Sequence, residues 1–154
     1  MPSKLMDKEI SFSTGLRSGL IDGIEWDDSL PEMNAASTTS TLKWLLIDRN
    51  TKLENMNIHW NFHKGQYVRI RIHNDAHSMH NMQHPIHFHG QRFVVAAIDG
   101  QVQTNLVWKD TALVRAGSIV DLILEASKPG AWIAHCHIAE HMEARMMLRF
   151  DVAD

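Results

Sequence analysis

Residues 135–146 have the sequence His-Cys-His-Ile-Ala-Glu-His-Met-Glu-Ala-Arg-Met, which is the strongest chemical signal in the chain. The stretch places the single cysteine, Cys136, between two histidines and ahead of His141 and Met146. One thiolate, two imidazoles and a weakly held thioether form the trigonal ligand set of a blue copper site, whereas zinc prefers four strong ligands in a tetrahedron. Cys136, His141 and Met146 therefore supply three copper ligands, and the second imidazole must come from elsewhere.

Residues 84–90, His-Pro-Ile-His-Phe-His-Gly, are the best source of that imidazole. Successive side chains of a strand point to opposite faces of the sheet. His135 and His137 therefore share one face, and Cys136 points to the other. The same alternation puts His87 and His89 together, whereas His84 can point the opposite way and join Cys136.

This parity predicts two separate metal locations on the two sides of one strand. The first holds His84, Cys136, His141 and Met146. The second is a set of four imidazoles, from His87, His89, His135 and His137.

The paired segments resemble the two C-terminal copper motifs of the multicopper oxidases, the family that includes laccases, bilirubin oxidases and cuprous oxidases. Three further stretches resemble the last cupredoxin domain of bacterial members, namely Gly-Ile-Glu-Trp-Asp-Asp at 23–28, Val-Trp-Lys-Asp-Thr at 107–111 and Pro-Gly-Ala-Trp at 129–132. The resemblance implies a type 1 copper held by His84, Cys136 and His141, with Met146 as axial ligand. It also implies that His87 binds a type 2 copper, and that a type 3 pair is bound by His89, His135 and His137.

The resemblance further implies an enzyme that oxidises a small-molecule or metal-ion reductant at the type 1 copper, with His141 as the point of electron entry. Cys136 and its neighbouring histidines would pass the electrons to a trinuclear copper cluster that reduces O2 to water. Such a cluster has eight histidine ligands, and this chain offers four in suitable motifs. We therefore expect an N-terminal cupredoxin domain to supply the other four, and the isolated domain to be inactive.

Two other functions remain open at this stage. A single-copper electron carrier needs only the type 1 ligands, but has no use for the four-imidazole set. A copper-binding or copper-tolerance module would hold cuprous ion through its histidines and methionines, and the segment 77–83, His-Ser-Met-His-Asn-Met-Gln, has suitably soft donors.

Two positions depart from the family pattern. Met142 stands where an acidic residue often follows the second type 1 histidine, and Glu143 is the adjacent carboxylate. Arg145 stands before the axial methionine, where glycine is common.

Composition predicts one compact domain over residues 1–154, because 154 residues with 44% hydrophobic content can build a core. A net charge of -3 without a basic run argues against nucleic acid, and no apolar stretch is long enough to span a membrane. The N-terminus lacks the apolar region of a signal peptide. A periplasmic or extracellular location is expected for the parent protein from the resemblance alone.

Short strands separated by turn signals predict an all-β sandwich or barrel, which the resemblance narrows to a Greek-key cupredoxin. An N-terminal strand and a wrapping loop occupy residues 1–40, and the copper-binding barrel occupies 41–154. The one short helix is predicted at 138–143. Strands are predicted at 9–13, 44–48, 66–73, 86–89, 93–99, 111–115, 119–126, 132–136 and 147–152.

Overall fold

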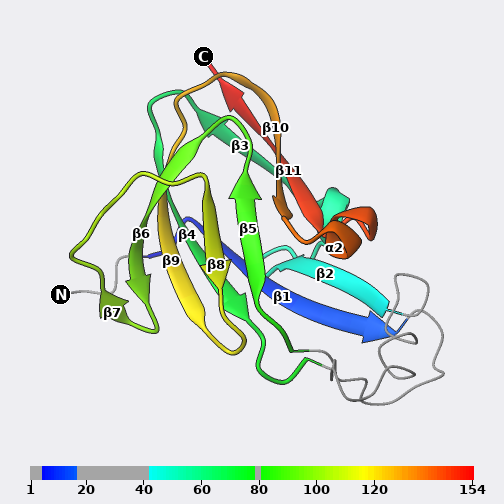
Figure 1. The fold of residues 1–154 in the computed structure, drawn as a ribbon. Coiled ribbons are helices and arrows are strands. Elements are labelled where there is room, and N and C mark those ends of the chain that lie inside the picture. Colours follow the sequence, from blue (N-terminus) through cyan, green and yellow to red (C-terminus); the bar gives the residue numbers. More distant parts are fainter. Residues whose placement is uncertain (1–4, 17–41, 79–80) are drawn as a thin grey trace.

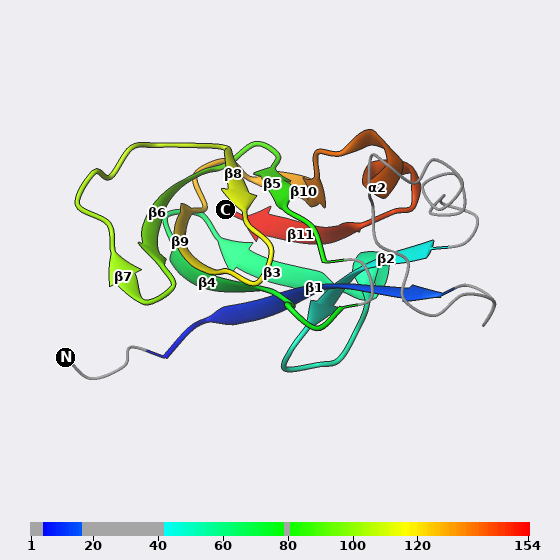
Figure 2. The same ribbon diagram turned by 60° about the horizontal axis from the view of Figure 1, so that its bottom comes forward.

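A computed structural model of the chain describes residues 5–16, 42–78 and 81–154, which form two β-sheets around a shared core (Figures 1 and 2). The six-stranded sheet has the order β2-β1-β4-β9-β6-β7 and the five-stranded sheet the order β3-β11-β10-β5-β8. The first sheet contains β1 (Lys8–Leu16), β2 (Leu42–Asp48), β4 (Tyr67–Asn74), β6 (Arg92–Ile98), β7 (Gln101–Val102) and β9 (Ile119–Glu125). The second contains β3 (His59–His63), β5 (His84–Phe88), β8 (Thr111–Val114), β10 (Gly130–Cys136) and β11 (Met147–Ala153).

Strand pairing is mostly antiparallel, but β1 pairs with β4, and β3 with β11, in the parallel sense. Parallel neighbours need long crossover connections, so the chain passes between the two sheets. β1 lies between β2 and β4, which makes the N-terminal strand an interior strand of its sheet.

The core follows from the alternation of apolar and polar residues along the strands. In β4 the apolar residues Val68, Ile70 and Ile72 are fully buried, while the intervening Tyr67, Arg69 and Arg71 face outward. Arg71 is held there by a bidentate ion pair with Asp121 of the neighbouring β9, with both N–O distances below 3 Å. One face of each sheet is therefore apolar, and the two apolar faces pack together.

The predicted all-β fold is confirmed, and each predicted strand is present with shifted ends. The predicted helix is present as α2 (Ala139–Glu143). β3 and β7 were not predicted, nor was the 3-10 turn Asn55–Asn57. The outward positions of β3 are His59, Asn61 and His63, so its sequence resembles a polar loop although Trp60 and Phe62 face the core. Residues 17–40 of the predicted N-terminal region, which include most of the wrapping loop, lie outside the described residues.

None of the described helices is long and apolar enough to cross a membrane.

Candidate metal centre

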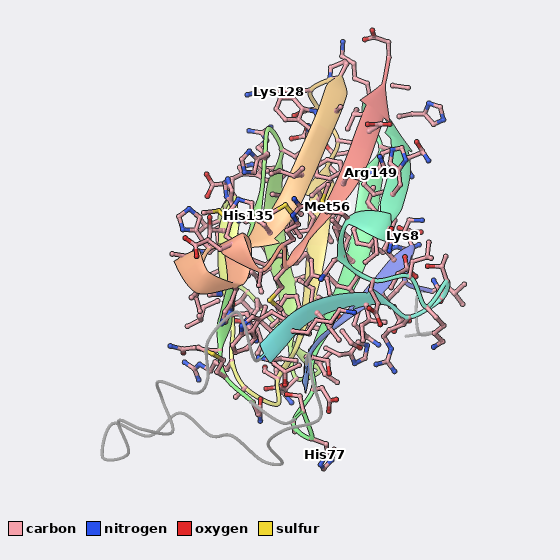
Figure 3. The ribbon with its side chains drawn as sticks, turned by 90° about the vertical axis from the view of Figure 1, so that its right-hand side faces the viewer. Lys8, Met56, His77, Lys128, His135 and Arg149 are labelled. Carbon is pink, nitrogen blue, oxygen red and sulfur yellow. The ribbon has the colours of Figure 1, made fainter. Side chains whose placement is uncertain are left out.

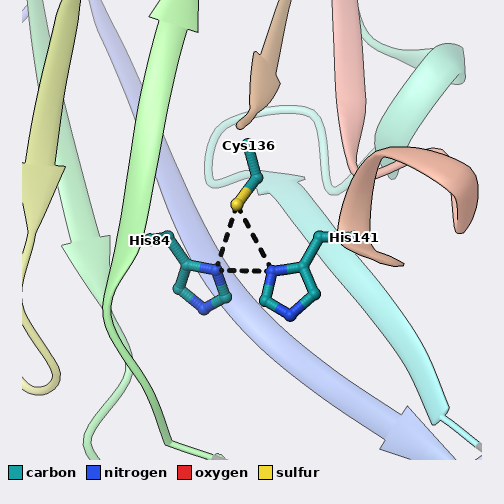
Figure 4. Close-up of side chains that lie close together, drawn as sticks. All are labelled: His84, Cys136 and His141. Carbon is teal, nitrogen blue, oxygen red and sulfur yellow. Dashed lines mark hydrogen bonds between the residues drawn. The ribbon is translucent and has the colours of Figure 1, made fainter. Parts of the chain in front are cut away.

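Three metal-ligating side chains converge at one end of the core from different elements. His84 begins β5, Cys136 ends β10 and His141 lies in α2 (Figure 4). The Nδ1 atoms of His84 and His141 are 3.2 Å apart. The Cys136 Sγ atom lies 3.6 Å from the His84 Nδ1 atom and 3.3 Å from the His141 Nδ1 atom. All three residues are at most 2% exposed.

The size of this triangle fits a metal ion. A point equidistant from the three donor atoms lies about 2 Å from each, close to the length of a metal–imidazole bond. Two imidazoles and one thiolate in a plane are the ligand set preferred by a blue copper. The donors therefore need little movement to bind copper.

Met146 is fully buried beside this trio. The Cys136 N–H group donates to the Met146 carbonyl at 3.2 Å, and the Met146 N–H group donates to the His141 carbonyl at 2.9 Å. These bonds fold the chain after α2 back onto the end of β10, and they link the backbone of Met146 to those of Cys136 and His141. Arg145 has a φ of 60°, the left-handed conformation that glycine adopts most easily. This conformation is a physical reason for the family's preference for glycine at the position.

Burial raises the pKa of the Cys136 thiol to about 11, although a hydrogen bond from the Ile138 backbone works in the opposite direction. The sulfur is therefore protonated at neutral pH in the metal-free protein. A metal must displace this proton to bind, because the thiolate is the ligand.

Four further imidazoles gather on the outer side of the five-stranded sheet, from His87, His89, His135 and His137. His87 and His135 are opposite each other in the β5–β10 register, and their ring centroids are 5.6 Å apart. His89 and His135 approach to 2.9 Å between their Nε2 atoms. His137 is exposed, with its ring 5.8 Å from His87 and 5.7 Å from His135.

Hydrogen bonds orient two of these rings. Carbonyl oxygens only accept, so the Nδ1–H group of His87 donates to the Asp110 carbonyl at 3.0 Å, and that of His135 donates to the Cys136 carbonyl at 2.9 Å. The lone pair of each ring is then on Nε2 and can bind a metal. Metal-bound imidazoles usually donate their other N–H group to such a partner. Every residue has a backbone carbonyl, so the sequence pattern could not single out these two partners.

Burial and the three neighbouring imidazoles lower the pKa of His89 below its ordinary value. Burial has the larger effect, because it disfavours the imidazolium form. The neutral form of His89 is therefore favoured, and in that form one of its two ring nitrogens has a lone pair that can bind a cation.

The two groups of side chains lie on opposite faces of β10. Cys136 pairs with the buried Ile86, one residue from the His135–His87 pair. Figure 3 shows His135 at the end of β10 next to α2, and Lys128 beyond the opposite end of the strand. The sequence-predicted residues are thus brought together as two clusters joined by the backbone between residues 135 and 137.

The two positions that depart from the family pattern are solvent-facing. Met142 is 43% exposed and Arg145 is exposed as well. Segment 77–83 lies only partly within the described residues, because 79 and 80 fall outside them.

Comparison with known proteins shows which family the sequence belongs to. The multicopper oxidase family model matches residues 26–154. A multicopper oxidase of Staphylococcus aureus is 29% identical over 134 residues, covering 77% of this chain and 30% of that protein. One from Mycobacterium tuberculosis is 39% identical over 70 residues, covering 46% of this chain and 13% of that protein.

Among solved structures, a multicopper oxidase from Campylobacter jejuni described as a metallo-oxidase superposes with a TM-score of 0.64 and 22% identity. The superposition covers 99% of this chain and 31% of that one, and at this identity it supports the cupredoxin-type fold alone. The chain spans less than a third of the length of each of these three relatives. Together with the family model's match, these similarities show that the chain belongs to the multicopper oxidase family.

Proposed function

We propose that this chain is the C-terminal copper domain of a larger oxidase, in which it holds a type 1 copper and half of a trinuclear cluster. The observation that carries the proposal is the position of the Cys136 trio and the four imidazoles on opposite faces of β10, one residue apart. Copper at the two locations supplies one-electron transfer and the reduction of O2 to water.

The chain's own residues account for several requirements of this function. His84, Cys136 and His141 exclude water from the first location, because they are at most 2% exposed. Met146 is the proposed axial ligand. Cys136 is covalently joined to both His135 and His137, so only a few bonds separate the two clusters.

The remaining cluster ligands are proposed to come from an N-terminal cupredoxin domain docked on the outer side of the five-stranded sheet. Hollows of about 390 Å³ and 560 Å³ border His87 and His89 on this side. Of the other histidines in the described part of the chain, His59 pairs with Asp151 and His73 with Glu9. This supports a ligand set of four imidazoles from this chain.

A single-copper carrier is the weaker alternative. Four imidazoles within hydrogen-bonding or ring-contact distance of one another have no role in such a protein. By its family, the complete oxidase is proposed to take electrons from a small molecule or a metal ion.

The test is the visible and near-ultraviolet absorption of the copper-loaded, oxidised chain. We expect an intense blue thiolate band without the near-ultraviolet shoulder of a bridged copper pair. Absence of the blue band would overturn the type 1 assignment. A shoulder in the isolated chain would show that it completes the cluster with itself and needs no partner domain.

The variant Cys136→Ser separates the two locations. This variant should lose the blue band, while metal analysis should still find bound copper. Adding His87→Ala and His135→Ala to it should lower the amount of bound copper. His63→Ala is the matched control, because His63 is exposed and lies outside both clusters. Loss of all bound copper in Cys136→Ser would contradict the presence of two independent locations.

A further inference from the structure

An aromatic wall formed by Phe12 of β1 and Trp44 of β2 packs against the two imidazoles of the Cys136 trio. The Trp44 indole stacks on the His141 ring with centroids 3.7 Å apart and planes inclined by 30°. It also meets His84 edge-on at 5.9 Å, and Phe12 meets His84 edge-on at 5.1 Å. Both wall residues are buried, Trp44 being 4% exposed.

The wall belongs to the sheet that supplies none of the trio. The trio comes from β5, β10 and α2, whereas β1 and β2 are paired with each other in the six-stranded sheet. Phe12 is paired with Leu46, and Trp44 is paired with Thr14, two residues further along the strands on the same inward face. The two aromatic side chains are therefore neighbours on one face of the strand pair.

The backbone of Trp44 is anchored although β2 is an edge strand. The side chain of Asn55 donates to the Trp44 carbonyl at 3.0 Å and accepts from the Leu46 N–H group at 2.8 Å. These bonds replace part of the missing neighbouring strand. Trp44 is therefore held on a fixed backbone, which a residue that orients another side chain requires.

The ring of His141 needs such support more than that of His84 does. His84 is the first residue of a strand paired on both sides, with β8 and with β10. His141 lies in a five-residue helix, which is too short to be rigid by itself. A stacked indole at van der Waals distance restricts rotation of the imidazole and occupies the space that water would need.

We propose that Trp44 is a positioning residue for the metal centre, which sets the orientation of the His141 ring and keeps water from becoming an additional ligand. The inference rests on the proposed function, because it concerns copper bound by the His84, Cys136 and His141 trio. Cupric ion left to its own preference adopts a tetragonal geometry with nitrogen and oxygen ligands. By closing the site, Trp44 would keep the donors of His84, Cys136 and His141 as the ion's strong ligands.

The test compares Trp44→Leu and Trp44→Phe with the wild-type chain in copper affinity, visible absorption and electron paramagnetic resonance. Leucine keeps the site apolar but cannot stack, whereas phenylalanine restores a ring. We expect Trp44→Leu to bind copper about 10- to 100-fold more weakly, as is usual when a residue that orients a ligand is lost. Its blue band should weaken and its resonance should become that of a tetragonal cupric site, and Trp44→Phe should restore both spectra.

Trp60→Phe is the matched control for a general loss of stability. Trp60 is 2% exposed in the same core, but its indole N–H group donates to Asp48. This variant should be destabilised while its copper spectra remain those of the wild type. Spectral change in Trp60→Phe equal to that in Trp44→Leu would overturn the inference, because core stability alone would then explain the effect.

The outcomes separate the two proposals. A blue wild-type chain whose spectra are unchanged by Trp44→Leu would overturn the positioning role and leave the proposed function intact. A wild-type chain without a blue band would overturn the proposed function itself. A folded Trp44→Leu variant, verified by thermal unfolding without copper, that has altered spectra supports the positioning role.

Discussion

Cys136 links the protonation of the metal-free protein to its stability. Burial raises the pKa of its thiol from 9.0 to about 11, so the folded state holds this proton more tightly than the unfolded chain does. The stabilisation is complete below the unfolded pKa and is lost as the pH rises through the folded one. Two pKa units correspond to about 3 kcal/mol.

We therefore expect the metal-free chain to lose about 2 kcal/mol of unfolding free energy between pH 8 and pH 11 through this group. Urea unfolding of the wild type and of Cys136→Ala across this range measures the effect, and the difference between them removes the contribution of other groups. A parallel loss of stability in both proteins would contradict the prediction.

The carboxylate of Asp48 is the corresponding case at low pH. Burial works to raise its pKa, but hydrogen bonds from the Trp60 indole and the backbones of Thr51 and Asn50 outweigh burial and hold the pKa below its ordinary value. The resulting stabilisation is present above the unfolded pKa and is lost as the pH falls through the folded one.

Asp48→Asn should lower the free energy of unfolding at pH 7 by about 1–3 kcal/mol, because the amide cannot satisfy both the turn and the buried Trp60 donor. Its stability should also fall less steeply than that of the wild type below about pH 4. Chemical unfolding at pH 7 and at pH 3 measures both effects, and equal pH dependence in the two proteins would exclude this role.

At the residue scale, the site could be predicted from the sequence where its chemistry was local. The alternation of side chains along a strand was sufficient to place Cys136 and His135 on opposite faces and to group His84 with Cys136. The wall residue Trp44 could not be predicted, because its contact with His141 joins positions about a hundred residues apart and is created only by the packing of the two sheets.

At the scale of elements, the turn between β5 and β6 depends on Gly90. Its φ is 69°, and a Cβ atom there would lie 2.5 Å from the Trp132 ring. The ring therefore occupies the place of a side chain, next to His89. Only glycine fits both the left-handed backbone and the close approach.

Gly90→Ala should destabilise the chain by about 2–4 kcal/mol through overpacking and backbone strain. Gly100→Ala is the control, since Gly100 has a φ of 78° but no atom within 4 Å of the added Cβ, and it should cost about 1 kcal/mol. Urea unfolding of both variants measures the difference. Equal effects would show that the Trp132 contact is unimportant.

Elements with strong alternation, such as β4, were predictable, whereas β3 was not. Its outward positions are polar and its five residues carry only two inward aromatic side chains. β3 exists because its backbone pairs in parallel with β11, the last strand of the chain. Such a pairing leaves no local pattern in the sequence.

At the scale of the whole molecule, copper should act as a stabilising ligand. The trio exists only in the folded chain, so an ion that binds it shifts the folding equilibrium by about 3 kcal/mol at a hundred times its dissociation constant. For a domain of this size, that corresponds to an increase in Tm of about 5–10 °C. Thermal unfolding with copper and after chelation should show this shift in the wild type, with a smaller shift in Cys136→Ser. The same shift in both proteins would place the stabilising copper elsewhere.

The fold as a whole was predictable only in class. The two-sheet architecture followed from short strands and from the family resemblance, but the position of β1 between β2 and β4 did not. Neighbouring strands in this molecule come from distant parts of the chain, and long-range pairing is determined by the packing of the complete core.

The pairing of His135 with His87 has a consequence for how this chain tolerates change. An insertion or deletion of one residue in β10 would turn Cys136 to the outer face and a histidine to the core, so a single event would destroy both clusters. Evolution of the domain by changes in length is therefore confined to segments outside this strand and outside residues 136–146, which carry His141 and Met146. Substitutions can tune either cluster separately, but the spacing between them is inherited as one unit.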